Sequence, residues 1–384
     1  MKFIINGSQL KAVLKHFTKL YDKSIIAKGA KNYTCIMTVT EDSFILESSL
    51  GGVYIKYQTS DVTVGKPGSV FLDLVVLFKS RFKNSAVAFE LDSDKNILRF
   101  VQGKYKGNYV PITEVDEFDY DEDAEYITLP SPEIEAALNG IAFKPEKGTP
   151  FLPVSIFSDS KQLRVVSMDN YKSAFYYKKT KGLQSSFFTI PHGIMQYIMT
   201  YLANTVETFQ MSSTEADTEI FIDTSSASWN IVIPVIEIDE TLLSYMKSIF
   251  NIVITARKED FDFKFNTNIT AFKEAIADVI PIGDSKDPFI RFLVKDSSLY
   301  FYVKSHQGEA TMNIPVEKVV ISNSTRISVY SRHLQEMLKL YPGKEMHMLY
   351  IGEDVEKASF KSNALLFGTD DTFVYMFPIS TDKD

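Results

Sequence analysis

The residues of this chain best suited to metal binding or nucleophilic chemistry are its histidines and its cysteine. No two histidines stand at the spacing of a metal-binding helix with a carboxylate partner, so no metal site is predicted. Cys35 is the one cysteine, which excludes an intrachain disulfide and a thiolate metal cluster. The chain has neither a phosphate-cradling glycine loop nor a GxSxG motif. We therefore expect no enzyme and no cofactor; the histidines are His16, His192, His306, His333 and His347.

An acidic run at residues 114–125, EVDEFDYDEDAE, has the beginning of a calcium-binding loop. Asp119, Asp121 and Asp123 stand at the first three ligand positions. Ala124 then occupies the position of the turn glycine, and Pro130 that of the bidentate glutamate. A solvated linker is therefore favoured over a calcium site.

Composition indicates a globular protein, with 45% hydrophobic and 23% charged residues. No apolar stretch approaches the ~20 residues of a membrane-spanning helix, and the opening MKFIINGSQL lacks the long apolar region of a signal peptide. We expect a cytoplasmic protein. The net charge of −8 argues against coating nucleic acid with the whole surface. A local basic face remains compatible with it, because salt screens charges over about 10 Å.

Six amphipathic helices are predicted from apolar residues recurring at helical spacing. Two are expected at residues 8–23 and 71–82, and the third begins at Ser131, a suitable N-cap followed by a proline. The last three follow Pro191, Asn268 and Ser331, and the apolar stripe after Pro191 is read as Ile194, Ile198, Tyr201 and Leu202. Alternating patterns predict strands between them, for example at residues 43–49, 163–168, 218–223, 299–305 and 346–352.

The order of helices and strands repeats three times, which indicates three similar units of roughly 120–130 residues. We expect domains at residues 1–122, 123–240 and 241–384. Each would hold two helices that pack one face on antiparallel sheets, an α+β fold. The other faces of the first, second and sixth helices carry an excess of cations, whereas the third helix offers Glu133 and Glu135. A basic surface is predicted from Lys11, Lys15, Lys19, Lys79, Arg81, Lys83, Arg332 and Lys339.

Several stretches together resemble the bacterial DNA polymerase sliding clamps. MKFIINGSQLKAVL is similar to that family's first strand and helix, and YITLPSPEIEAAL to the start of its second domain. ITAFKEAIADVIPI, followed by IRFLVKDSSLYFYV, resembles a helix and hairpin of the third domain, and VYMFPIS the terminal apolar strand. In QLRVVSMDNYKSAFY, Asp169 matches the family's Thr-Asp-Gly-His-Arg-Leu pattern and Lys172 replaces its arginine, whereas the neighbouring residues depart from it. These departures indicate a divergent member, for which a bacteriophage origin is plausible.

The resemblance implies a ring of two chains joined head to tail, with helices lining the hole. Such a ring would encircle double-stranded DNA without reading its sequence, face it with the basic residues named above, and tether a DNA polymerase. A clamp loader would be a further partner, in a bacterial cell or an infected bacterial host. Two other classes stay open: a scaffold protein built from three repeated domains, and a hydrolase whose site the sequence does not display.

The resemblance also implies two protein-binding surfaces. The dimer seam would involve Tyr105 from one chain and Ile280 and Ile282 from the other, although a core position is an equal alternative for both isoleucines. A pocket for a linear peptide would lie beside the apolar chain end, where Pro378 suits an edge or the end of a strand. Its predicted lining is Leu152, Met168, Asn170, Tyr171, Lys172, Ser173, Leu242, Tyr330, His333, Val355, Phe377, Pro378 and Ile379.

Overall fold

The computed structural model divides the chain into two compact units. The first comprises Met1–Glu135 and Leu183–Ile236, and the second Ala136–Gly182 and Glu237–Asp384. The structure describes residues 1–23, 34–112, 124–141, 153–168, 173–235, 263–283, 289–306, 308–321, 327–341, 344–351, 364–368, 373–378 and 380–381. The predicted division into three domains stays a prediction.

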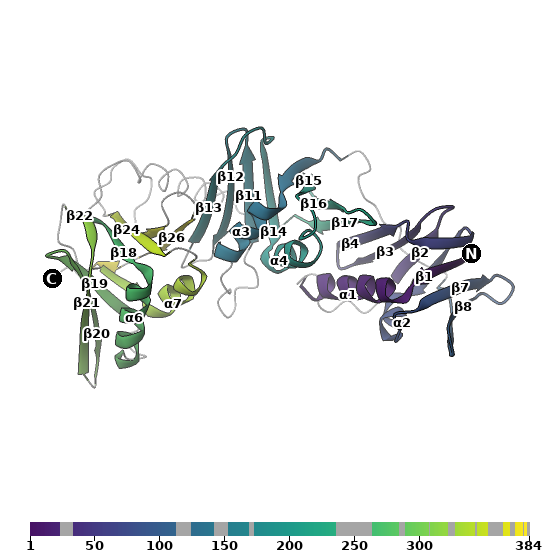
Figure 1. The fold of residues 1–384 in the computed structure, drawn as a ribbon, viewed down its shortest axis with the longest axis horizontal. Helices are drawn as coiled ribbons and strands as arrows, with labels where there is room; N and C mark the ends of the chain where they lie inside the picture. Colours follow the sequence, from purple (N-terminus) through teal and green to yellow (C-terminus); the bar gives the residue numbers. More distant parts are fainter. Residues whose placement is uncertain are drawn as a thin grey trace. The chain divides into compact units, whose positions relative to one another are not determined.

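Two antiparallel sheets build the first unit (Figure 1). The β1 sheet has the order β5 (Val62–Lys66), β1 (Lys2–Asn6), β7 (Ala86–Asp92), β8 (Ile97–Gln102) and β9 (Tyr105–Tyr109). The β4 sheet has the order β10 (Ile127–Pro130), β15 (Thr208–Ser213), β16 (Asp217–Asp223), β17 (Ala227–Pro234), β4 (Val53–Thr59), β3 (Phe44–Leu50), β2 (Thr34–Val39) and β6 (Gly68–Asp73). Trp229 of β17 pairs with Tyr57 of β4, so this sheet runs continuously across the expected boundary near residue 122.

Among the described residues, the helices that lie wholly in the first unit are α1 (Gly7–Lys23), α2 (Leu74–Lys79) and α4 (His192–Tyr201), which follows β14 (Ser186–Pro191). Helix α1 contacts β1, β4, α2 and α4. Its apolar stripe is buried as predicted, and Gln9 donates hydrogen bonds to Tyr57 Oη and Thr59 Oγ1 of β4, both at 3.0 Å. Helix α3 (Ser131–Ile141) crosses the residue at which the units divide.

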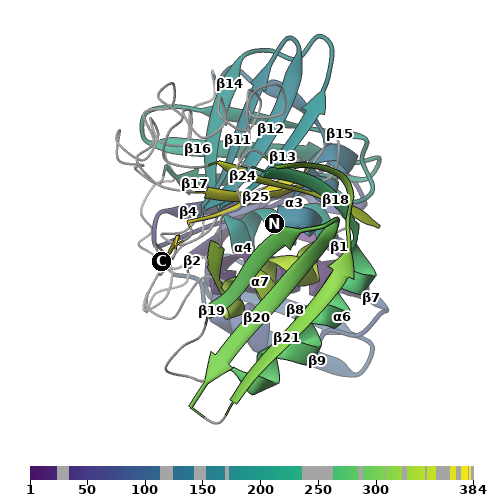
Figure 2. The same cartoon turned by 90° about the vertical axis from the view of Figure 1, so that its left-hand side faces the viewer.

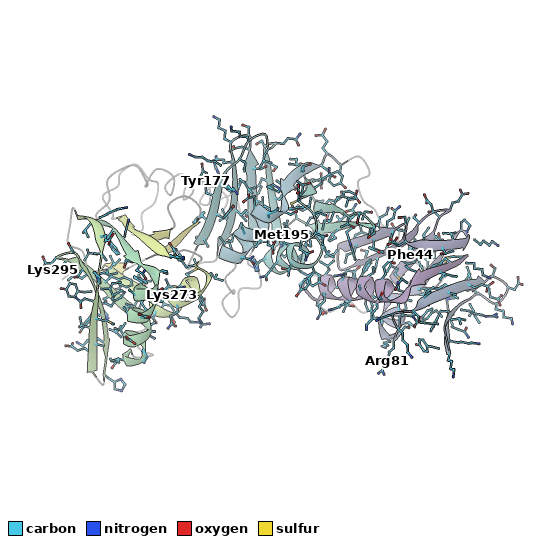
Figure 3. All side chains as sticks on the ribbon, viewed as in Figure 1. Phe44, Arg81, Tyr177, Met195, Lys273 and Lys295 are labelled. Carbon is cyan, nitrogen blue, oxygen red and sulfur yellow. The ribbon has the colours of Figure 1, made fainter. Side chains whose placement is uncertain are left out.

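The core of the first unit is aromatic. The Phe3 ring of the β1 sheet lies 5.4 Å from the Phe44 ring of the β4 sheet and stacks on Phe89 at 4.9 Å. Phe82 and Phe100 extend this cluster, with their ring centroids 5.6 Å apart. Figure 3 shows Phe44 among the strands of this unit, where it is fully buried.

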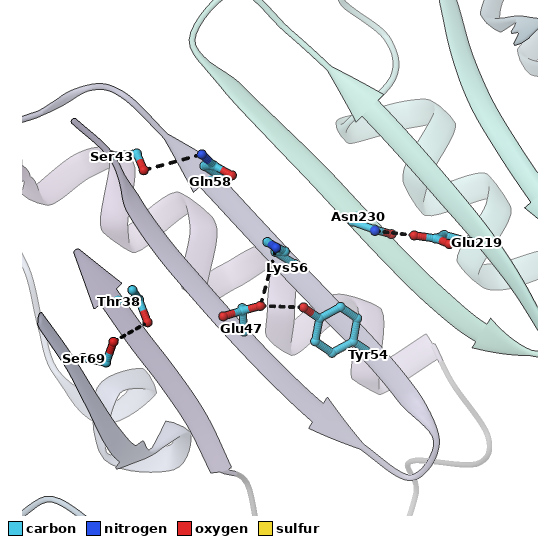
Figure 4. A network of polar contacts seen from close by, with 9 residues as sticks. All are labelled: Thr38, Ser43, Glu47, Tyr54, Lys56, Gln58, Ser69, Glu219 and Asn230. Atoms are coloured by element: carbon cyan, nitrogen blue, oxygen red, sulfur yellow. Dashed lines mark hydrogen bonds and ion pairs between the residues drawn. The ribbon is translucent and has the colours of Figure 1, made fainter. Parts of the chain in front are cut away.

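The face of the β4 sheet opposite the helices is polar (Figure 4). Glu47 accepts a hydrogen bond from Tyr54 Oη at 2.7 Å and lies 3.8 Å from Lys56 Nζ. Asn230 Nδ2 donates to Glu219 on the neighbouring strands. Because this face holds its own polar pairs, the apolar stripes of the helices are buried on the other face alone.

The second unit also has two antiparallel sheets. The strands that this unit contributes to the β26 sheet follow the order β11 (Pro153–Asp159), β12 (Gln162–Met168), β13 (Ser173–Lys179), β26 (Phe373–Pro378), β25 (Ala364–Gly368), β24 (Glu345–Ile351), β18 (Phe263–Asn268) and β22 (Glu317–Ile321). The β20 sheet has the order β21 (Gly308–Pro315), β20 (Ser298–Ser305), β19 (Phe289–Lys295), β23 (Ile327–Tyr330) and β27 (Ser380–Thr381).

Helices α6 (Ile269–Val279) and α7 (Ser331–Leu340) belong to the second unit, with a short 3-10 turn, η1 (Ile280–Ile282), after α6. Figure 2 shows α6 beside β20 and β21, which it contacts. Asn268 caps α6 by accepting hydrogen bonds from Thr270 N at 2.9 Å and Ala271 N at 3.2 Å. Together with the five strands predicted by range, these elements confirm the α+β class with antiparallel sheets.

Three local predictions are wrong. The helix expected at residues 71–82 is only α2, since residues up to Asp73 belong to β6; Asp73 accepts a hydrogen bond from Val75 N and starts the helix there. Phe71 is therefore a half-exposed strand residue rather than part of a helical stripe. Ser131 does not cap α3 through its side chain, whose Oγ has no hydrogen-bond partner. Tyr201, placed on the apolar stripe of α4, is 59% exposed.

Candidate functional site

Helix α1 presents a lysine face to solvent. Lys11, Lys15 and Lys19 are exposed on the side opposite the buried stripe of Leu10, Leu14 and Phe17. Lys19 Nζ lies 3.5 Å from Asp22 Oδ2, but both side chains are about half exposed, so this ion pair is weak. The result is a concentrated positive charge along one helix.

Further exposed cations lie at the end of α2 and on the segment that follows it. Lys79, Arg81 and Lys83 are exposed, and Arg81 projects from the lower part of the unit in Figure 3. Helix α2 contacts α1, so these cations belong to the same unit and the same group of helices as the α1 lysines.

A buried glutamine holds the backbone at Lys83. Gln102 is 3% exposed; its Oε1 accepts from Lys83 N at 2.8 Å, and its Nε2 donates to the carbonyls of Lys83 at 2.9 Å and Ser85 at 2.6 Å. Gly7, where α1 begins, donates its N–H to Ser85 O. A Cβ at Gly7 would collide with the Lys83 carbonyl and the Gln102 amide, so this close approach requires glycine.

The second unit contributes Arg332 and Lys339, both exposed on α7. Arg332 Nε lies 3.5 Å from Glu336 Oε1, one helical turn along. The predicted basic residues therefore form two groups, one on α1, α2 and the following segment and the other on α7. The second group is partly neutralised by its own carboxylate.

Helices α1 and α4 are joined through an aromatic contact, which we call the α1–α4 joint: His16, Tyr197, Trp229 and Tyr57. His16 Nδ1 lies 2.9 Å from Tyr197 Oη, and the His16 ring meets the Trp229 ring edge-on at 5.5 Å. Trp229 in turn lies 4.7 Å from Tyr57. Burial, aided by the charge of Lys15, lowers the pKa of His16, whereas burial raises the pKa of Tyr197 to about 12. Both groups are therefore neutral near pH 7.

Tyr201 lies at the end of the α1–α4 joint and is exposed, whereas the sequence pattern had predicted it on the apolar stripe of α4. Its ring lies 4.8 Å from that of Tyr197, one turn earlier on α4. Because a tyrosine at helical spacing reads as core, the sequence offered no signal that this ring is exposed.

The described lining residues of the predicted peptide pocket all belong to the second unit. Strand β26 pairs with β13 through Met376–Ser173 and Phe373–Tyr176. Phe377 and Pro378 therefore continue past the first residue of β13, and among the described strands they pair with β25. Pro378 is the last residue of β26, in agreement with its expected place at the end of a strand.

The chain end then passes to the other sheet of the same unit. Ser380 and Thr381 form β27, which pairs with Ser328 and Ile327 of β23. Strand β23 ends at Tyr330, whose ring lies 4.6 Å from that of the buried His333 on α7. Ser173 is buried, and Met168 ends β12. The other predicted lining residues lie outside the described residues: Leu152, Asn170, Tyr171, Lys172, Leu242, Val355 and Ile379.

The predicted dimer residue of the first unit lies on a sheet edge. Tyr105 begins β9, the last strand of the β1 sheet, and is 37% exposed. The Phe100 ring supports this edge, 5.1 Å from Tyr105 and 5.0 Å from Tyr109. A Cβ at Gly107 would collide with the Phe100 ring, so the aromatic cluster itself explains why a larger residue is absent there.

The predicted dimer residues of the second unit lie next to another sheet edge. Ile280 and Ile282 form η1, which contacts β20 and the terminal strand β21. Ile282 is 43% exposed and Ile280 is half-buried, so the alternative of a core position is wrong for both.

The described residues contain no group of three or more metal-ligating side chains, and the calcium-like run at residues 114–123 lies outside them. Among the same residues, no helix is long and apolar enough to cross a bilayer.

The fold is shared with solved structures over nearly the whole chain. The DNA polymerase III β subunit of Thermotoga maritima matches with a TM-score of 0.73 at 14% identity, and the match covers 99% of each chain. A putative β subunit from Eubacterium rectale gives 0.74 at 15% identity, and the DNA polymerase sliding clamp of Bacillus subtilis 0.72 at 16%, each again over 99% of both chains. No protein-family model and no curated protein matches the chain.

These matches define an α+β protein with the sliding-clamp architecture. The chain has the fold of the β sliding clamps of DNA polymerase III, which confirms the resemblance predicted from its sequence as far as the fold is concerned.

Proposed function

We propose that this protein is a sliding clamp: a ring that encircles double-stranded DNA and tethers a DNA polymerase, without catalysing a reaction itself. The observation that carries the proposal is the lysine face of α1 in a chain of net charge −8 that has the clamp fold from end to end. Even in an acidic protein, one helix face with several exposed lysines and a single carboxylate is suited to a local contact with a polyanion.

The contact would be made to the DNA backbone. Exposed lysines on flexible stems neutralise phosphates without reading bases, so binding should be independent of sequence and sensitive to salt. Such contacts are weak individually, which permits sliding, and retention would come from the closed ring.

Two copies would close the ring through sheet edges. Strands β9 and β21 are the terminal strands of their sheets in the part of the chain that the structure describes, and a second chain can pair with such an edge. The β9 edge offers Tyr105 between Lys104 and Lys106, and the β21 edge offers Glu309 with Ile282 of η1 beside it. The two edges are complementary, because the aromatic Tyr105 would face the aliphatic Ile282 and the neighbouring lysines would face Glu309. Two identical seams related by a two-fold axis would then close a dimer.

Polymerase and clamp loader would bind through linear peptides at the end of β26. There Phe377 and Pro378 extend beyond β13, and the chain crosses to β23 and the Tyr330–His333 pair. An apolar strand end next to aromatic side chains suits a short peptide with apolar anchors.

Retention on circular DNA tests the function. The protein, incubated with nicked plasmid and a clamp loader, should co-elute with the plasmid on gel filtration and be released when a restriction enzyme linearises it. Light scattering at micromolar concentration should give a dimer. A monomer, or retention unaffected by linearisation, would contradict the ring and favour the scaffold alternative.

A further inference from the structure

We propose that Tyr201, next to the lysine face of α1, forms a binding site for an unpaired base of single-stranded DNA. The proposal rests on the proposed function and deepens it, because it distinguishes the nucleic acid contacted at this point from the duplex that the ring encircles.

The ring of Tyr201 is exposed yet supported. It is 59% exposed, but its centroid lies 4.8 Å from that of Tyr197 at an interplanar angle of 38°. Tyr197 is 8% exposed and contacts His16, which packs edge-on against the buried Trp229. The Tyr201 ring thus has a rigid aromatic layer behind it, so little conformational entropy is lost when a ligand stacks on it.

The charge around this ring suits a polyanion. The α1–α4 joint places the aromatic end of α4 beside the α1 segment that carries Lys15 and Lys19, since His16 lies between them in the sequence. Helix α4 has no acidic residue, and on α1 Asp22 is the one carboxylate, which already faces Lys19. On these two helices a phosphate backbone would therefore meet several cations and one carboxylate, Asp22, which lies beside Lys19.

The nature of the ring contact selects single strands. Bases in a duplex are stacked on both neighbours and present only their edges and backbone, which the lysines alone can engage. An unpaired base offers its face, and stacking on an aromatic side chain tolerates any sequence. Surfaces that bind single strands combine positively charged side chains for the backbone with aromatic side chains on which bases stack. Lysines beside an exposed tyrosine provide this combination.

Fluorescence anisotropy with the full chain tests the proposal. The probes are a labelled oligothymidine of about 20 nucleotides, long enough to cover more than one binding site, and a duplex of the same length, titrated at low and moderate salt. Tyr201→Ala should weaken binding of the single strand roughly 5- to 100-fold and leave duplex binding unchanged. Tyr201→Phe keeps the ring and should bind like the parent.

Phe71→Ala is the matched control. Phe71 is a half-exposed aromatic residue of the same unit, but it points to the face of the β4 sheet opposite α1, so its loss should change neither affinity. The single tryptophan, Trp229, lies in the α1–α4 joint, and unchanged emission in Tyr201→Ala would verify that the joint is intact.

Unchanged single-strand affinity in Tyr201→Ala, or an equal loss on single strand and duplex, would overturn the proposal. Its failure is distinguishable from that of the proposed function. A clamp without this site retains plasmid and shows no effect of Tyr201→Ala on short oligonucleotides. A protein that is no clamp loses retention on circular DNA while the oligonucleotide titrations still report on Tyr201.

Discussion

The two units carry their exposed cations in different ways. Helix α1 of the first unit has four lysines and one aspartate, and its lysines are held away from the sheet by a continuous buried stripe. Helices α6 and α7 of the second unit together have three basic and three acidic residues, and Arg332 is paired with Glu336 at 3.5 Å. Yet α1 and α7 bury equivalent apolar stripes against their own sheets. Packing therefore constrains one side of each helix and leaves charge on the other side free to differ.

In the proposed clamp, this difference means that the two units attract DNA unequally. The first unit would supply most of the attraction, and the second unit would act mainly as a spacer and a partner-binding platform. The following variants test that inequality.

The largest effect is expected from Lys11→Ala, Lys15→Ala and Lys19→Ala combined. Removing three phosphate contacts should weaken duplex binding roughly 100-fold at physiological salt and lower the slope of log affinity against log salt by about 3. Anisotropy titrations across a salt series measure both quantities. The matched control, Arg332→Ala with Lys339→Ala, should weaken duplex binding much less. An equal loss of affinity in the control would contradict the inequality between the two units.

A smaller effect is expected on stability from Gln102→Ala. The variant leaves Lys83 N and the Lys83 and Ser85 carbonyls without their buried partner, which should lower the free energy of unfolding by about 1–3 kcal/mol. Urea denaturation measures it. Gln58→Ala removes an amide whose 3.4 Å bond to Ser43 lies on the polar sheet face, and it should be near neutral.

Glu336→Gln should make α7 more similar to α1. Releasing Arg332 from its partner removes one negative charge from the surface, so duplex affinity should rise by a few fold at low salt and by less at high salt. The same titrations measure this gain. Lost or unchanged affinity at low salt would mean that α7 does not face the DNA.

The smallest effect is the pH dependence of the α1–α4 joint. The pKa of His16 is lowered by burial, so between that lowered pKa and the ordinary value near 6.5 the unfolded chain binds more protons than the folded one. Stability should therefore fall as the pH drops below about 6.5 and be fully present above it. His16 is only partly buried, so solvent screening keeps the change small.

Thermal unfolding followed by Trp229 fluorescence, from pH 7.5 to 5, measures this dependence. His16→Asn should flatten it, and Lys15→Ala should reduce it, since the Lys15 charge contributes to lowering the pKa of His16. An unaltered slope in His16→Asn would assign the pH dependence to other groups.

Periodicity alone determined much of this protein. Alternation in residues 299–305 and the stripe of Leu334, Met337 and Leu338 predicted β20 and α7 because burial of one face requires those periods. The start of α6 after Asn268 was also predicted, and the structure adds that the Asn268 side chain caps the helix by accepting hydrogen bonds from backbone groups two and three residues on. The exposed lysines of α1 were predicted in the same way, because they lie opposite the apolar stripe of that helix.

Contacts distant in sequence were decided by the tertiary structure. Phe71 belongs to β6 because β2 pairs with it, and this pairing overrides the helical spacing of the residues that follow. On α4 it is Tyr197, not Tyr201, that contacts His16, 181 positions away, and Gly107 is required because Phe100 lies over it. The register that carries Phe377 and Pro378 past the start of β13 depends on strands about 200 residues apart. A local pattern reports which faces must be buried, but which partner buries them is set only when the sheets assemble.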